Sequence, residues 1–238
     1  MVIIVLPIMY PLYAFSHIIS GPYLQYPTES SITVCWMTDT ATTGTVAYGP
    51  KDGAQSGAVT TTISDTHHIA MIEGLNSASE YWYTVTSGGD TSGPWVFRTA
   101  PAISETVETR IVLWSDMQHE KTLIDENGDW LPGTATTNQR IRTEANLSLM
   151  MTYAPHIQFV IGDFVSVGDE DKEWYHAFKV LRPLCSTAPI LLAQGNHDLG
   201  GANTLLRKYM VLPDNSPTEA TRETCWSLDY GDINISAM

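Results

Sequence analysis

Apolar positions recur at every second residue in the first part of the chain, from about residue 21 to residue 100. In residues 31–36, for example, Ile32, Val34 and Trp36 fall on one face of an extended segment. Gly-Pro and Gly-Gly pairs separate several of these segments, as turns require. Several short strands at regular spacing predict a β-sandwich.

The hydrophobic pattern changes beyond residue 108. Continuous apolar runs at 111–114, 157–161 and 189–193 predict strands that are buried on both faces. Two helical patterns lie between them, with Ile141, Ala145, Leu149 and Tyr153 in the first and Trp174, Phe178 and Leu181 in the second. The order strand, helix, strand, helix, strand predicts a partial α/β domain with parallel strands and right-handed crossovers.

These patterns divide the chain into a leader and two domains. Residues 1–16 are mostly apolar and end in a small-x-small motif, which predicts a signal peptide and a secreted, periplasmic or extracellular protein. Two prolines interrupt this run and no basic residue precedes it, so a buried N-terminal strand is the alternative. The run is too short to span a bilayer, which takes about 20 residues. A sandwich domain is predicted over 17–100, a linker over 101–108 and an α/β domain over 109–238.

The net charge and the number of cysteines argue against several classes of protein. The 238 residues include 12 basic and 26 acidic side chains, a formal net charge of −14. This balance argues against a nucleic-acid groove and against docking on an anionic membrane. Three cysteines are too few for a disulfide scaffold. Cys185 and Cys225 could pair after export, whereas Cys35 lies in a strand pattern and is expected to be buried.

Polar side chains follow each predicted parallel strand at its carboxyl end. They are Asp116 and Gln118 after the first strand, Asp163 after the second, and Asn196, His197 and Asp198 after the third. Ligands bind at this edge of open α/β sheets, so we expect these residues to converge. Two carboxylates, an amide oxygen and an imidazole suit divalent metals. The alternative for any one of them alone is a helix cap or a turn residue.

A pair of metals would also offset the negative charge at this edge of the sheet. Two converging carboxylates without a cation repel each other, and a chain of charge −14 has little positive charge with which to hold a phosphate ester. Two metals about 3.5–4 Å apart polarise phosphoryl oxygens and generate hydroxide near neutral pH. The pattern therefore predicts a metal site at this edge, which could hold a phosphate.

Taken together, the motifs resemble those of a known group of enzymes. Their order is Asp-x-Gln, Gly-Asp-x-Val-x-x-Gly and Gly-Asn-His-Asp, which is similar to that of the calcineurin-like metallophosphoesterases. In the first domain, the leucine-then-tyrosine stretch at 74–81 is similar to that of fibronectin type III domains, with Trp36 as the inner-face tryptophan. The combination resembles purple acid phosphatases and their bacterial counterparts. This resemblance implies a metal-dependent phosphoric ester hydrolase with a dinuclear centre of iron, manganese or zinc.

The resemblance implies a role for each residue of the motifs. Asp116 resembles a ligand of the first metal, Asp163 the bridging carboxylate and Asn196 a ligand of the second metal. His197 would contact the substrate phosphate and assist the leaving group. Asp198 would orient His197.

The chain also departs from the family pattern. Gln118 stands where many relatives have histidine and is expected near the metal as a weaker ligand. Ser166 replaces the tyrosine that binds iron(III) in purple acid phosphatases. A Gly-His-x-His segment is absent, and the chain stops at Met238 within an apolar alternation. We therefore expect an N-terminal portion of a longer protein, which alone would bind metals weakly because open coordination positions go to water.

Two other functions stay open at this stage. One is a non-catalytic cell-surface or wall-binding module with a degenerate phosphoesterase domain. The other is a phosphodiesterase. The sequence leaves the substrate, the oligomeric state and the activity of this portion alone undetermined.

Overall fold

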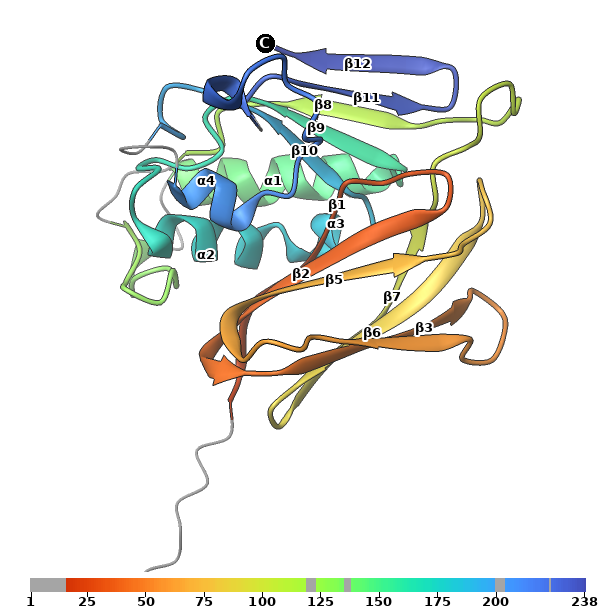
Figure 1. Cartoon of the computed structure of the whole chain (residues 1–238). Coiled ribbons are helices and arrows are strands. Elements are labelled where there is room, and N and C mark those ends of the chain that lie inside the picture. Colours follow the sequence, from red (N-terminus) through yellow and green to blue (C-terminus); the bar gives the residue numbers. More distant parts are fainter. Residues whose placement is uncertain (1–15, 119–122, 135–137, 200–203, 223) are drawn as a thin grey trace, which may run out of the picture.

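The computed structural model describes residues 16–118, 123–134, 138–199, 204–222 and 224–238. The chain forms a β-sandwich followed by a partial α/β unit, which confirms the predicted fold class (Figure 1). The predicted signal peptide lies outside the described residues except for Ser16. Among the helices of the described ranges, none has the length and apolar character needed to cross a membrane.

Two antiparallel sheets make up the sandwich. One has the order β1-β2-β5, with β1 (Ile18–Gln25), β2 (Ser31–Thr42) and β5 (Asp65–Glu73). The other has the order β4-β3-β6-β7, with β3 (Gly44–Pro50), β4 (Gly57–Thr60), β6 (Glu80–Ser87) and β7 (Asp90–Arg98). Alternate residues of the two sheets meet in one core, which includes Val34, Trp36, Ile72, Tyr83 and Val85. The period of two in the sequence therefore reports the buried face correctly.

Tyr81 and Trp36 take the positions that the sequence predicts for them. Tyr81 Oη accepts a hydrogen bond from the backbone N–H of Asn76 at 2.9 Å, the contact of a tyrosine corner. Trp36 is buried and stacks on His68, with the ring centroids 4.8 Å apart. His67 and His68 face opposite sides of β5, as neighbours on a strand do. His68 is buried, with its ring against Trp36 and its Nε2 3.0 Å from Thr38 Oγ1.

The second unit is built on a parallel sheet with the order β10-β9-β8. Its elements are β8 (Ile111–Trp114), α1 (Asn138–Thr152), β9 (Ile157–Ile161), α2 (Asp171–Val180), α3 (Arg182–Cys185) and β10 (Ile190–Ala193). After them come α4 (Thr204–Tyr209), a short 3₁₀ turn (Glu219–Thr221) and a hairpin of β11 (Trp226–Tyr230) with β12 (Ile233–Ala237). The helices α1 and α2 lie on one side of the sheet and the hairpin lies on the other (Figure 1).

Strand β8 and helix α1 are more exposed than the sequence predicts. The prediction that 111–114 is buried on both faces is wrong, because β8 is an edge strand and Leu113 is 63% exposed. The apolar series in α1 is also exposed, with Leu149 at 57% and Tyr153 at 61%. Leu147 of α1 packs against the core instead. Residues two positions apart on a helix point about 200° apart, so Leu149 faces away from it.

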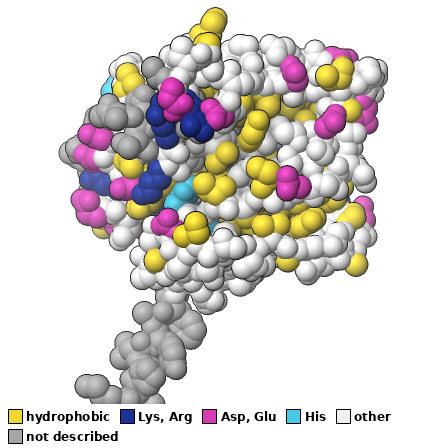
Figure 2. Space-filling model, viewed as in Figure 1, with side chains coloured by type: hydrophobic (Ala, Val, Ile, Leu, Met, Phe, Trp, Pro, Cys, Tyr) yellow, Lys and Arg dark blue, Asp and Glu magenta, His cyan; other side chains and the backbone are white. Residues whose placement is uncertain are grey.

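Strand β1 joins the two units into one structure. Tyr23 of β1 stacks on Phe178 of α2, with the ring centroids 3.7 Å apart and the planes 13° apart. Tyr23 Oη also donates a hydrogen bond to the Tyr209 carbonyl at 2.9 Å, and Ser20 Oγ donates one to the Tyr175 carbonyl at 2.8 Å. The hydrophobic cluster of the α/β unit thus includes residues of the sandwich. Hydrophobic side chains are scattered over the face of the molecule that Figure 2 shows.

All three cysteines are free. Cys35 and Cys185 are buried, as expected for Cys35, and burial raises the pKa of both thiols. The pairing considered for Cys185 and Cys225 is not formed. Gln158 lies beside Cys185 instead, with Nε2 at 3.6 Å from its sulfur.

We predict that Phe178→Ala lowers the free energy of unfolding by about 3–5 kcal/mol, because Phe178 is fully buried against Tyr23. Since the cluster spans both units, hydrogen exchange should accelerate in β3 and β6 as well as in α2. The exposed Tyr153→Ala is the control, with a change within about 0.5 kcal/mol. Unchanged exchange in the sandwich strands would show that the two units unfold independently.

A second prediction concerns acid stability. His176 is 4% exposed, with Nδ1 2.8 Å from the Gly128 carbonyl oxygen and the Trp130 ring against it. Burial lowers its pKa from 6.5 to about 4. The stabilisation by the neutral ring is therefore complete above pH 6.5 and is lost as the pH falls towards 4, an effect on the order of 3 kcal/mol.

The measurement is denaturant unfolding at neutral pH and near pH 4. His176→Gln should lessen the loss of stability in acid without removing it, because burial also lowers the pKa of His67 to about 4. The exposed His17→Gln is the control and should leave the acid loss as it is in the unmodified protein. An acid loss that is equally large in His176→Gln would contradict the assignment.

Candidate metal centre

Hydrogen bonds tie together the three loops that follow β8, β9 and β10. Asp116 N–H donates to the Gly162 carbonyl at 3.4 Å, and Met117 N–H donates to the Asp163 carbonyl at 3.2 Å. From the third loop, His197 N–H donates to Asp163 Oδ1 at 3.0 Å. The three loops therefore converge as the sequence predicts, with Asp163 between the other two.

Two aspartates of this edge adopt a backbone conformation that is rare for residues with a side chain. Both Asp116 and Asp163 have φ of +55°. Left-handed backbone at a non-glycine residue costs about 1–3 kcal/mol and occurs preferentially at functional sites. At Asp116 and Asp163 this conformation ends the extended course of the chain, just where the loops after β8 and β9 begin.

Two glycines of the motifs are required by close backbone approach. A Cβ atom on Gly195 would lie 2.3 Å from both the backbone N and Oδ1 of Asp163. A Cβ atom on Gly168 would lie 2.2 Å from the Asp198 carbonyl oxygen. Any side chain at these positions would push the second and third loops apart.

Asp198 fastens the second and third loops to each other. Its Oδ1 accepts hydrogen bonds from the N–H groups of Phe164 at 2.8 Å and Val165 at 3.0 Å, and its Oδ2 accepts one from Gly195 N–H at 2.9 Å. The carboxylate is fully buried. Burial raises its pKa, and the three backbone hydrogen bonds oppose that rise.

His197 is oriented by a different group from the one expected. The sequence assigns this role to Asp198, but His197 Nδ1 lies 2.9 Å from the Ser166 carbonyl oxygen, and Asp198 binds backbone amides instead. A buried carboxylate is satisfied better by three amide donors than by one exposed imidazole. With Nδ1–H donating to the Ser166 carbonyl, the exposed His197 ring keeps Nε2 available for other partners.

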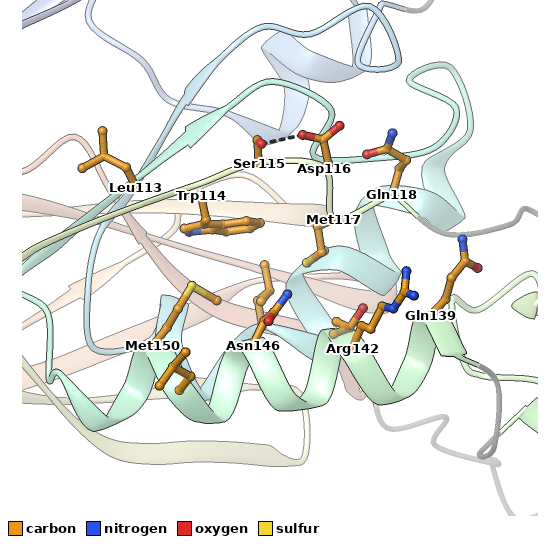
Figure 3. Close-up of a pocket in the computed structure, with 13 residues that line it drawn as sticks. Leu113, Trp114, Ser115, Asp116, Met117, Gln118, Gln139, Arg142, Asn146 and Met150 are labelled. Atoms are coloured by element: carbon orange, nitrogen blue, oxygen red, sulfur yellow. Dashed lines mark hydrogen bonds between the residues drawn. The ribbon is translucent and has the colours of Figure 1, made fainter.

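Gln118 and Asp116 lie next to each other at the end of β8 (Figure 3). Ser115 Oγ donates a hydrogen bond to Asp116 Oδ2 at 2.5 Å. Gln118 Oε1 is buried, and it has no hydrogen-bond partner among the described residues. A buried amide oxygen without a partner is the kind of group that a cation or its water would satisfy.

The donor set favours oxygen coordination. Within the described ranges, no three histidine, cysteine, aspartate or glutamate side chains gather closely enough to hold a metal ion. The donors that the loops do present are the carboxylates of Asp116 and Asp163 and the amides of Gln118 and Asn196. Such a set fits one hard divalent ion whose remaining positions are taken by water. It does not by itself supply the coordination shell of a second ion.

A pocket of about 410 Å³ opens beside this group, between β8 and α1. Gln139, Arg142 and Asn146 of α1 line it opposite Asp116 and Gln118 (Figure 3). These three residues were not predicted as site residues, because the apolar positions of this helix dominate its sequence pattern. Their spacing of three and four residues is the signal that would have placed them on one side of the helix.

Comparison with known proteins supports this description. Residues 19–99 match the family model of the "Purple acid Phosphatase, N-terminal domain". Two curated relatives from Arabidopsis thaliana are similar. "Probable inactive purple acid phosphatase 27" is 26% identical over 106 residues, which cover 44% of this chain and 16% of the relative. "Probable inactive purple acid phosphatase 24" is 25% identical over 138 residues, which cover 55% and 21%.

Two solved structures share the fold of both units. Purple acid phosphatase PPD1 from yellow lupin (Lupinus luteus) has a TM-score of 0.67 and 19% identity over 90% of this chain and 43% of its own. PhoD has a TM-score of 0.67 and 11% identity over 95% and 52%. The predicted resemblance to purple acid phosphatase-like metallophosphoesterases is confirmed. The chain spans about half the length of these structures, and its match to the curated relatives spans less than a quarter of theirs.

We predict that Asp198→Ala lowers the free energy of unfolding by about 3 kcal/mol or more, because three backbone N–H groups lose their acceptor. Amide exchange at Phe164, Val165 and Gly195 should accelerate before the rest of the chain. The exposed Asp169→Asn is the control, with exchange unchanged. Equal protection of these amides in the two variants would contradict the role given to Asp198.

Proposed function

We propose that this chain, whose two units have the fold of purple acid phosphatase-like metallophosphoesterases, acts as a metal-dependent phosphoric ester hydrolase. The observation that supports the proposal best is the convergence of three loops on Asp163 through backbone hydrogen bonds. Oxygen donors from all three loops then surround one edge of the sheet, where a cation would offset their charge. Because the chain spans about half of the similar structures, the activity is proposed for the protein as a whole.

The residues at this edge of the sheet have different proposed roles. Asp116, Asp163, Asn196 and Gln118 would hold the metal, with Asp163 as the bridging ligand if two ions bind. When bound, iron, manganese or zinc would polarise the phosphoryl group and lower the pKa of a coordinated water. Asp198 keeps the second and third loops in register.

His197 is proposed to act on the leaving group. Its ring is exposed at the rim, and Nδ1 is held by the Ser166 carbonyl. Nε2 can then bind the phosphate or pass a proton to the departing oxygen. The apolar leader supports an exported location, so the substrate would be a phosphate ester outside the cytoplasm.

A non-catalytic binding module is the second candidate function. Two observations favour it: both curated relatives are named inactive, and Gln118 replaces a stronger imidazole ligand. In this case the sandwich would make the contacts and the α/β unit would be a scaffold. A phosphodiesterase is the third possibility, and diester substrates in the same assay address it.

We predict that Asp163→Asn reduces metal affinity and metal-dependent turnover of para-nitrophenyl phosphate by about a hundredfold or more, because even outer partners of metal ligands contribute about 10–100-fold. The asparagine oxygen can still accept the N–H of His197, so the fold should survive. Metal content and turnover are measured with manganese, zinc and iron, and Asp169→Asn serves as the control. Absence of both bound metal and turnover in the unmodified protein would favour the binding module.

A further inference from the structure

The pocket between β8 and α1 adjoins the candidate metal centre directly. Asp116 and Gln118 line it together with residues of α1. In Figure 3 the loop with these two side chains lies on one side of the space and α1 lies on the other. An ester whose phosphate binds at the metal centre can therefore extend its organic part into the pocket.

One wall of the pocket is apolar and fixed in place. The Trp114 ring lies over the helix, and its Nε1 donates a hydrogen bond to Gln158 Oε1 at 3.2 Å (Figure 3). Leu149 and Met150 of α1 also line the pocket, and Met150 lies on the side opposite Trp114 (Figure 3). The volume of about 410 Å³ falls within the range of small-ligand sites, about 300–1,000 Å³. An aromatic or compact apolar group fits this wall.

The other part of the pocket carries a positive charge. Arg142 projects from α1 toward Met117 and Gln118 (Figure 3). Across the described part of the chain its guanidinium has no hydrogen-bond or ion-pair partner. Arg140 on the same helix is different, since it pairs with Glu144 at 2.8 Å and lies over the Trp130 ring at 5.5 Å. In a chain with 26 acidic side chains, an arginine without a partner beside a pocket is placed to receive an anion from outside.

We propose that the pocket receives the organic part of the phosphoric ester and that Arg142 binds a second anionic group on that part. The preferred substrates would then be phosphate esters whose alcohol or phenol carries a carboxylate or a further phosphate. Gln139 and Asn146 lie on the same side of α1 and add amide donors near this group. The inference rests on the proposed function for the position of the phosphate.

The test compares two phosphonates that cannot be hydrolysed, benzylphosphonate and para-carboxybenzylphosphonate. Their affinities for the full chain are measured by calorimetry with and without manganese. We expect the carboxylated ligand to bind about tenfold more tightly, as for one charge-assisted hydrogen-bonded pair. Arg142→Gln should remove this preference and leave the affinity for benzylphosphonate unchanged. Arg142→Lys should keep part of it, and Arg140→Gln is the matched control that should keep all of it.

The outcomes separate this inference from the proposed function. A preference that depends on Arg142 in a chain without turnover would support the pocket and count against hydrolysis by this chain alone. Turnover together with equal binding of the two phosphonates, or a preference retained in Arg142→Gln, would overturn the pocket and leave the hydrolase standing. Failure of both phosphonates to bind would overturn the role of Arg142. Melting temperatures equal to that of the unmodified chain establish that each variant is folded.

Discussion

The arrangement of the candidate site depends on one buried carboxylate. Asp198 accepts three backbone N–H groups from two loops that are 30 or more residues apart along the chain. Without this acceptor, the N–H groups of Phe164, Val165 and Gly195 would be buried without partners, so the loops could not pack at their present distance. The position of Asp163 relative to His197 is thus fixed by a residue that offers no free oxygen to a ligand. Its role is to position the other residues.

The sandwich contributes to the same rigidity through α2. Tyr23 of β1 packs face to face on Phe178, while Trp174 on the same helix donates to the Gly168 carbonyl at 3.2 Å. Gly168 in turn donates its N–H to the His197 carbonyl at 3.0 Å. A continuous series of contacts therefore runs from the first domain through α2 to the third loop. This explains physically why the two units share a hydrophobic core.

The sequence predicts the elements and their convergence well, and it predicts side-chain partners poorly. The period of two and the continuous apolar runs locate the strands, and parallel strands must bring their carboxyl ends to one edge. The partners of Asp198 could not be predicted. The sequence is the same whether its carboxylate accepts a hydrogen bond from the His197 ring or from backbone N–H groups. The exposure of Leu113 and Leu149 could not be predicted either, since apolar spacing does not report which elements cover a face. Arg142 was missed for the related reason that its surroundings are set by β8, far away in the sequence.

Charge is the constraint that links the site to its ligands. The edge presents carboxylates in a chain of net charge −14, so an anionic phosphate gains little there until a cation is bound. Two positive charges would then lie on opposite sides of one pocket. One is a metal bound by Asp116 and Asp163, and the other is the guanidinium of Arg142. A ligand with two anionic groups at matching separation engages both, whereas a simple phosphate engages one. Selectivity would follow from the spacing between the loop and α1, which the packing of Leu147 against the core holds constant.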